Sequence, residues 1–250
     1  MAECAPEAAR GQDLAPLCPL CPGETGQDQR AGARCPPRPL WRGDNRISGR
    51  GSTYDQPEYE PFWATAAALQ MPLSPHTAAR RQGRIRGAGP RTLRDASSRA
   101  TKAFYPALSM CDMIFSGVFE RHPRLTLAIV EFELAWAPNV LTSMDYTYRE
   151  RHGEALYRFK NGMFPSDFFH RNVVLSFQED AIGIRLRDVI GTDNMMWGSD
   201  YPHSESTFPR SRQILAEILE GVPDDEQAKI AGGNTARVYH FDVARLTVSA

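Results

Sequence analysis

The sequence lacks the features that assign a chain to a membrane, a secretory pathway or a nucleic acid. It has no run of about 18 consecutive apolar residues, the length that a transmembrane helix needs. The N-terminus shows no basic region followed by an apolar stretch, so no secretory signal is expected and the cytoplasm is the predicted location. The formal net charge is only -1, so no overall field favours nucleic acid or a membrane surface.

Lysine is almost absent, and the basic residues are instead arginines, several of which crowd a glycine-rich segment at residues 80–99. Asp95 is the only acid in that segment. Such a run could bind an anion or a nucleic acid, but no aromatic residues are interleaved with it. We therefore predict a solvated loop and no nucleic-acid partner. If the segment has a function, an anionic small substrate or an acidic neighbour suits it better.

Cysteines are few and unevenly placed, at positions 4, 18, 21, 35 and 111. Cys18 and Cys21 could form half of a zinc knuckle, with Cys4 and Cys35 as the other ligands. The spacing matches no common zinc module, and no helix or strand pattern surrounds it. We interpret these cysteines as incidental thiols.

Residues 1–50 contain no histidine and no sustained apolar periodicity. They hold seven prolines, six glycines and seven arginines. That composition buries too little apolar surface to offset the entropy of ordering, so the segment is predicted to be disordered or loosely attached. The predicted folded domain spans residues 53–242.

Strand and helix patterns alternate through that domain, which predicts an α/β fold with a parallel sheet. Four buried strands are expected at residues 71–75, 125–130, 172–177 and 195–199. Helices are expected at residues 57–69, 103–119, 137–152, 182–190, 211–219 and 224–231. The helix at 103–119 should turn Phe104, Leu108, Cys111, Phe115 and Val118 inward. A closed TIM barrel needs eight strands, so the pattern predicts a partial TIM barrel, whose open edges a second copy of the chain could cover.

Polar residues follow the expected strands, and the most informative of them is Asp200. Pro202 cannot continue a strand ladder, so the last strand should stop near Asp200 and leave it beside His203. In α/β barrels the carboxyl ends of the strands carry the chemistry, which makes Asp200 a candidate catalytic residue. Asp200 could instead only cap the following loop. His203 could face a substrate or simply belong to the turn.

Several landmarks of the chain resemble one known family when they are taken together. They are residues 54–63 (YDQPEYEPFW), 71–76 (MPLSPH), 115–123 (FSGVFERHP), Glu131 with residues 136–138 (WAP), 194–203 (NMMWGSDYPH) and 234–239 (NTARVY). In this order they are similar to the amidohydrolase-related family, the metal-dependent TIM-barrel group that includes aminocarboxymuconate-semialdehyde decarboxylase. Residues 1–50 match nothing in that family.

The resemblance implies a divalent metal, Zn, Mn or Fe, held by His76, Glu131 and Asp200. Nitrogen and carboxylate ligands suit these metals. Asp200 would also move the proton in the hydrolysis or decarboxylation of a small organic acid or related substrate, with His203 as a substrate-facing group. In the decarboxylase branch the position of Glu131 is often histidine. His76 could also be a packed or solvent-facing histidine, Glu131 could pair with an arginine, and Glu133 competes with Glu131 for the inward direction.

The family's first strand carries a His-x-His pair, and this sequence has no histidine before His76. We hypothesise a truncated or out-of-frame start, which would impair activity. The alternative function is therefore a non-catalytic remnant of the family that lacks a complete metal site.

Overall fold

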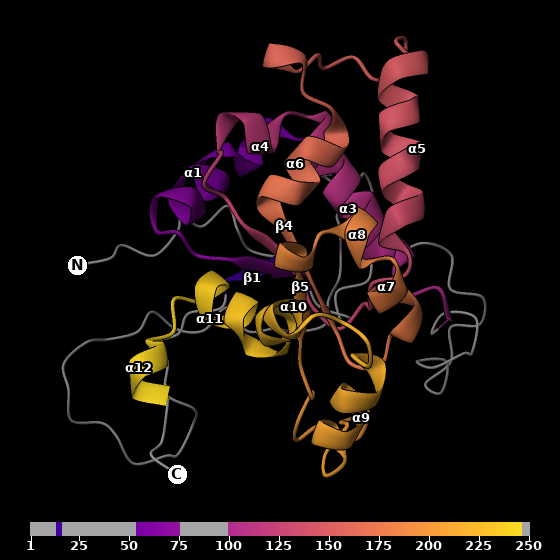
Figure 1. Cartoon of the computed structure of the whole chain (residues 1–250). Helices are drawn as coiled ribbons and strands as arrows, with labels where there is room; N and C mark the ends of the chain where they lie inside the picture. Colours follow the sequence, from indigo (N-terminus) through magenta and orange to yellow (C-terminus); the bar gives the residue numbers. More distant parts are fainter. Residues whose placement is uncertain (1–13, 17–53, 76–99, 247–250) are drawn as a thin grey trace, which may run out of the picture.

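Five short strands form a single sheet in a computed structural model that describes residues 14–16, 54–75 and 100–246 (Figure 1). The strands lie in the order β1 (Leu14–Pro16), β2 (Leu73–Pro75), β3 (Leu127–Ile129), β4 (Val173–Phe177) and β5 (Met195–Trp197). β2 to β5 run parallel, and β1 pairs with β2 in the antiparallel direction. The four parallel strands are those that the sequence predicts. β1 falls within residues 1–50, where no strand is expected from the sequence.

Helices connect the parallel strands, which confirms the predicted α/β class. Before β5 they are α1 (Glu60–Ala68), α3 (Phe104–Phe115), α4 (Val118–Arg121), α5 (Ala137–Glu150), α6 (Pro165–Asn172), α7 (Ala181–Arg185) and α8 (Arg187–Ile190). After β5 come α9 (Ser211–Ile218), α10 (Asp224–Ala228), a π-helical turn (Lys229–Gly233), α11 (Asn234–Val238) and α12 (Val243–Leu246). Single 3-10 turns occur at Pro57–Tyr59, Lys160–Gly162 and Thr192–Asn194. No described helix is both long and apolar enough to cross a bilayer.

The two faces of the sheet are covered differently, because successive side chains of a strand point to opposite sides. One face carries Leu127, Leu175 and Met195 into the main core, beneath the helices that precede β5 (Figure 1). Each such fully buried aliphatic side chain contributes about 1.5–3 kcal/mol to stability. The opposite face is a smaller apolar cluster of Ala128, Val174 and Met196 with Val238 of α11.

The inward face of α3 differs from the prediction. Phe104 and Leu108 are 68% and 50% exposed, so the expectation that they point inward is wrong. The apolar residues that α3 buries are Ala107, Met110, Met113 and Ile114. The predicted stripe extended through Gly117, whose φ of 74° ends α3 and starts a new helix, so that stripe never lies on one continuous helix.

Three buried asparagines repeat the same contact at the amino-terminal ends of successive strands. Asn172, immediately before β4, donates from Nδ2 to the Leu125 carbonyl at 2.7 Å. Asn194, immediately before β5, donates to the Val173 carbonyl at 2.7 Å and to the His170 carbonyl at 2.9 Å. Asn234 of α11 donates to the Met195 carbonyl at 2.8 Å. Each amide thus links the segment that carries the asparagine to the beginning of the preceding strand.

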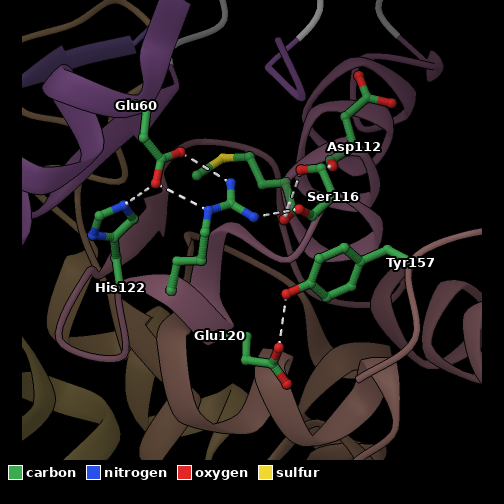
Figure 2. A network of polar contacts seen from close by, with 8 residues as sticks. Glu60, Asp112, Ser116, Glu120, His122 and Tyr157 are labelled. Atoms are coloured by element: carbon green, nitrogen blue, oxygen red, sulfur yellow. Dashed lines mark hydrogen bonds and ion pairs between the residues drawn. The ribbon is translucent and has the colours of Figure 1, made fainter. Parts of the chain in front are cut away.

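A polar network joins α1 to the α3–α4 corner just before β3 (Figure 2). Glu60 accepts two hydrogen bonds from Arg121, at 2.9 and 3.0 Å, and lies 2.7 Å from Nε2 of His122. Beside it, the hydroxyl of Tyr157 donates to Glu120 at 2.7 Å. These residues lie at the amino-terminal end of β3, where barrel residues usually serve stability. The 115–123 landmark is therefore a structural clamp in this fold.

Candidate functional site

The carboxyl ends of β3 and β5 bring two of the predicted site residues together. Glu131 follows β3 and Asp200 follows β5, on either side of β4 in the sheet. Because the strands are parallel, both residues emerge at the same edge. Their carboxyl groups lie close enough for Glu131 to raise the pKa of the Asp200 carboxyl. The structure thus pairs Glu131 with Asp200, as a common site requires.

The environment of Asp200 disfavours its charged form. Burial first, and then the neighbouring charge of Glu131, raise the pKa of the Asp200 carboxyl above its ordinary value. His203 acts in the opposite direction and stabilises the carboxylate. A carboxyl group held near a second one is a common feature of acid–base and metal sites, because one proton or one cation relieves the repulsion.

Both carboxylates stand on left-handed backbone. The φ angles are 70° at Glu131 and 58° at Asp200, a region that residues other than glycine seldom occupy. Such conformations persist where the surrounding structure holds them, and they concentrate at functional sites. The Glu131 N–H also lies 3.5 Å from the Ser176 hydroxyl of β4. The left-handed backbone at both residues is therefore energetically unfavourable, and it sets the direction in which the two carboxylates leave the strand ends.

His203 lies next to Asp200, as its position three residues later suggests. Its Nδ1 is 3.2 Å from Oδ2 of Asp200 and 3.3 Å from the backbone nitrogen of Glu205. When Nδ1 carries a proton it donates to Asp200, and when it does not it accepts from the Glu205 N–H. The side chain is 51% exposed, so the ring is accessible from solvent beside the carboxylate.

Glu133 points to a different partner from Glu131. Its Oε2 accepts the Gln178 N–H at 3.2 Å, and its backbone carbonyl accepts from the indole of Trp136 at 3.0 Å. Burial raises the pKa of the Glu133 carboxyl above its ordinary value, and the Gln178 N–H partly opposes that shift. Of the two competing acids, Glu131 is the one whose carboxyl meets Asp200.

A divalent cation fits the chemistry of the Glu131–Asp200 pair, because it would replace the repulsion between two carboxyl groups with attraction. Carboxylate oxygens are also suitable ligands for Mn²⁺ and Zn²⁺. The third predicted ligand, His76, lies outside the described residues. Within residues 54–75 and 100–246, no group of three His, Cys, Asp or Glu side chains is placed to hold a metal. The described part of the chain therefore supplies two of the three predicted ligands.

Two residues at this edge were not singled out from the sequence. Gln178, directly after β4, donates from Nε2 toward the carbonyls of Ser199 and Glu205 at 3.4 and 3.3 Å. Asp180 accepts the N–H groups of Leu134 and Ala135, both at 2.7 Å. The sequence signal that could have identified Gln178 and Asp180 is their position, since polar residues immediately after a buried strand lie at the functional edge of a barrel.

The comparison with known families settles the membership of this chain. The sequence profile of the family described as amidohydrolase matches residues 43–241, so the expectation that residues 1–50 match nothing in the family is wrong for residues 43–50. The chain belongs to the amidohydrolase family. The resemblance seen in its sequence landmarks is thereby confirmed.

Relatives of this amidohydrolase-family chain include decarboxylases. A gamma-resorcylate decarboxylase of Rhodococcus jostii is 26% identical over 200 residues, which cover 77% of this chain and 58% of that protein. The crystal structure of 5-carboxyvanillate decarboxylase from Sphingomonas paucimobilis superposes with a TM-score of 0.58 at 27% identity, covering 76% of this chain and 55% of the other. This chain therefore spans less than two thirds of the length of either relative.

A third comparison concerns the fold. A dihydroxybenzoic acid decarboxylase from a Polaromonas species, solved with bound manganese and the inhibitor 2-nitroresorcinol, gives a TM-score of 0.55 at 19% identity. The match covers 80% of this chain and 60% of that one. At this identity the likeness shows the fold alone. The sheet and its helices are thus a partial TIM barrel of the amidohydrolase type, as the sequence predicts.

Proposed function

We propose that this chain acts as a metal-dependent carboxy-lyase on a small hydroxylated aromatic acid. The observation that carries the proposal is the placement of Glu131 and Asp200 on left-handed backbone after the carboxyl ends of β3 and β5, where the two carboxyl groups interact. Decarboxylation is favoured over hydrolysis because the named relatives are decarboxylases of acids of this kind. Hydrolysis of an ester or amide is the other reaction class of the proposal.

Each site residue has a proposed role. Glu131 and Asp200, with His76 as third ligand, would hold Zn²⁺, Mn²⁺ or Fe²⁺. A divalent cation there would act as a Lewis acid toward the oxygens of the substrate. His203, exposed beside Asp200, would face the substrate's carboxylate or hydroxyl group.

The proton transfer is assigned to Asp200. As the carbon–carbon bond breaks and CO₂ leaves, the bonding electron pair stays on the ring carbon, which must then accept a proton. We assign the holding and delivery of that proton to the Asp200 carboxyl. General acid–base assistance of this kind typically contributes about 10²–10⁴-fold in rate.

Activity and metal binding can be tested together on the purified chain. The chain is supplied with Mn²⁺ and incubated with 2,6-dihydroxybenzoate or 5-carboxyvanillate while CO₂ release is measured. Asp200→Asn should reduce the rate by at least about 10²-fold, because it removes the proton-carrying group. Asp193→Asn is the matched control, since the Asp193 side chain is 67% exposed and pairs with Lys229 instead. Release of CO₂ that is equal in the two variants would contradict the role of Asp200.

A non-catalytic remnant of the family is the second candidate. It is favoured by the sequence, which has no histidine before His76 and so no counterpart of the His-x-His pair that the family resemblance implies. A folded wild-type chain that binds no metal and releases no CO₂ from either acid would support this candidate over the first.

The remaining partner predictions follow from charge and shape. A net charge of -1 supports a small-molecule substrate and neither a nucleic-acid nor a membrane partner. Association of two copies is proposed as a way to cover the open edge of the partial barrel, and light scattering during size-exclusion chromatography measures it directly.

A further inference from the structure

The loop of residues 199–207 carries both Asp200 and His203 and is closed on itself. The Thr207 N–H donates to the Ser199 carbonyl at 3.1 Å, which joins the two ends of the loop. Thr207 is buried, with 4% of its surface exposed, and its hydroxyl lies 2.9 Å from that of Ser211 at the start of α9. Inside the loop, the His203 N–H donates to the Asp200 carbonyl at 2.8 Å. The base of the loop is thus fixed, while Asp200 stands within it on left-handed backbone.

Gln178 reaches this loop from β4 and contacts it on both sides of Asp200. Its side-chain nitrogen Nε2 lies 3.4 Å from the carbonyl of Ser199, which precedes Asp200. The same nitrogen lies 3.3 Å from the carbonyl of Glu205, near the far end of the loop. One amide group, with two N–H donors, therefore serves two carbonyls of the loop.

The backbone of Gln178 is itself held at two points. Its N–H donates to Oε2 of Glu133 at 3.2 Å, and its carbonyl accepts from the indole nitrogen of Trp197 at 3.1 Å. Glu133 lies two residues beyond Glu131, and Trp197 lies at the end of β5. Gln178 thus connects the segment that carries Glu131 with the segment that carries Asp200.

This connection matters because Asp200 has an unfavourable backbone conformation. A φ of 58° is retained only where neighbouring contacts determine it. Loss of the Nε2 contacts would leave the Ser199 carbonyl with the Thr207 N–H as its hydrogen-bond donor and the Glu205 carbonyl without Gln178, which would loosen the direction in which the Asp200 carboxyl points. Groups that orient a ligand in this way commonly alter metal affinity without touching the metal.

We propose that Gln178 is a positioning residue that holds the loop of residues 199–207 and so keeps the Asp200 carboxyl facing Glu131. The inference deepens the function proposed for Asp200 and rests on it. Gln178 touches neither the proposed metal nor the substrate in this scheme, and acts only through the loop.

The test compares Gln178→Met with Gln227→Met. Methionine keeps the length of the side chain but removes the N–H donors. Gln227 is the matched control, because its Nε2 also donates to a backbone carbonyl, that of Val222 at 2.8 Å, but in α10. Gln178→Glu is a second variant without the donor, to be used if the methionine variant does not fold.

Two readouts separate positioning from general stability. Hydrogen exchange of the loop amides should become at least about 10-fold faster in Gln178→Met and stay at the wild-type rate in Gln227→Met. Affinity for Mn²⁺ alone should fall about 10–100-fold in Gln178→Met only, and the visible spectrum of the Co²⁺ form should change with it. Thermal unfolding of both variants is also recorded, so that the effects on the loop and on the metal can be compared between variants of known stability.

The outcomes distinguish this inference from the function on which it rests. Unchanged exchange of the loop in both donor-less variants would overturn the positioning role, whatever the metal does. Faster exchange with unchanged Mn²⁺ affinity and an unchanged Co²⁺ spectrum would also overturn it, because the loop would then not govern Asp200. A wild-type chain that binds no metal, while Gln178→Met still loosens the loop, would overturn the proposed function and leave the holding of the loop by Gln178 supported.

Discussion

Replacing Asn194 by alanine should destabilise the fold strongly, although Asn194 touches no residue of the proposed site. Its side-chain amide makes short hydrogen bonds to the carbonyls of Val173 and His170, and only 6% of the residue is exposed. Each such bond contributes about 0.5–1.5 kcal/mol, and a buried carbonyl left without a partner costs about 1–3 kcal/mol. We therefore expect Asn194→Ala to lower the free energy of unfolding by about 2–4 kcal/mol.

Urea unfolding followed by far-ultraviolet circular dichroism measures this change directly. Asn139→Ala is the control, because Asn139 is an exposed residue of α5, where surface substitutions usually stay within about ±0.5 kcal/mol. A loss at Asn194 no larger than the loss at Asn139 would refute the argument that the asparagine contacts hold successive strand units together.

Two further predictions concern the clamp at the amino-terminal end of β3. Gly117→Ala should cost about 1–3 kcal/mol more than Gly162→Ala, because both glycines have positive φ but only at Gly117 would a Cβ clash with the Tyr157 ring. Equal losses of stability in thermal unfolding would contradict this prediction. The hydrogen bond from Arg121 lowers the pKa of Glu60 below its ordinary value of 4.5, so the stability from this pair is present above pH 4.5 and is lost as the pH falls through the lowered value. The Glu60 side chain is 39% exposed, so Glu60→Gln should lower the free energy of unfolding by less than about 1 kcal/mol near pH 7. A difference in unfolding free energy between variant and wild type that does not become smaller toward about pH 3 would contradict this prediction.

The class of the fold could be predicted from the sequence because local apolar runs encode the parallel strands. The runs at residues 125–130 and 172–177 became β3 and β4 within a residue or two. Helix faces were harder to predict: in the apolar stripe of residues 103–119, Phe104 and Leu108 are exposed. Cys111 and Phe115 of the same stripe do pack against the core, and Val118 is buried. β1 was missed because its three residues carry no periodic signal.

The candidate site was predictable only in part. The positions of Glu131 and Asp200 after two strands indicated one edge of the sheet, and the structure brings their carboxyl groups together. The sequence could not show that Glu133 turns toward the backbone of Gln178, because that depends on left-handed backbone at both glutamates. His76 stays a prediction, as does the metal that it would share with the two carboxylates.

The contacts of Gln178 illustrate the same limit. Its amide meets carbonyls 21 and 27 residues farther along the chain, in a loop that is closed by the hydrogen bond between Ser199 and Thr207. No local pattern encodes such a contact. Only the position of Gln178 directly after a strand could have indicated a role at this edge of the sheet.

The metal content of the purified chain tests the central claim most directly. Elemental analysis after growth and purification with added Mn²⁺ and Zn²⁺ is made on wild type, Asp200→Ala and the exposed-site control Asp193→Ala. If Glu131 and Asp200 hold a cation, about one equivalent of metal should accompany wild type and the control and be lost in Asp200→Ala. Metal that is absent from the wild-type chain, or retained equally in Asp200→Ala, would contradict the account.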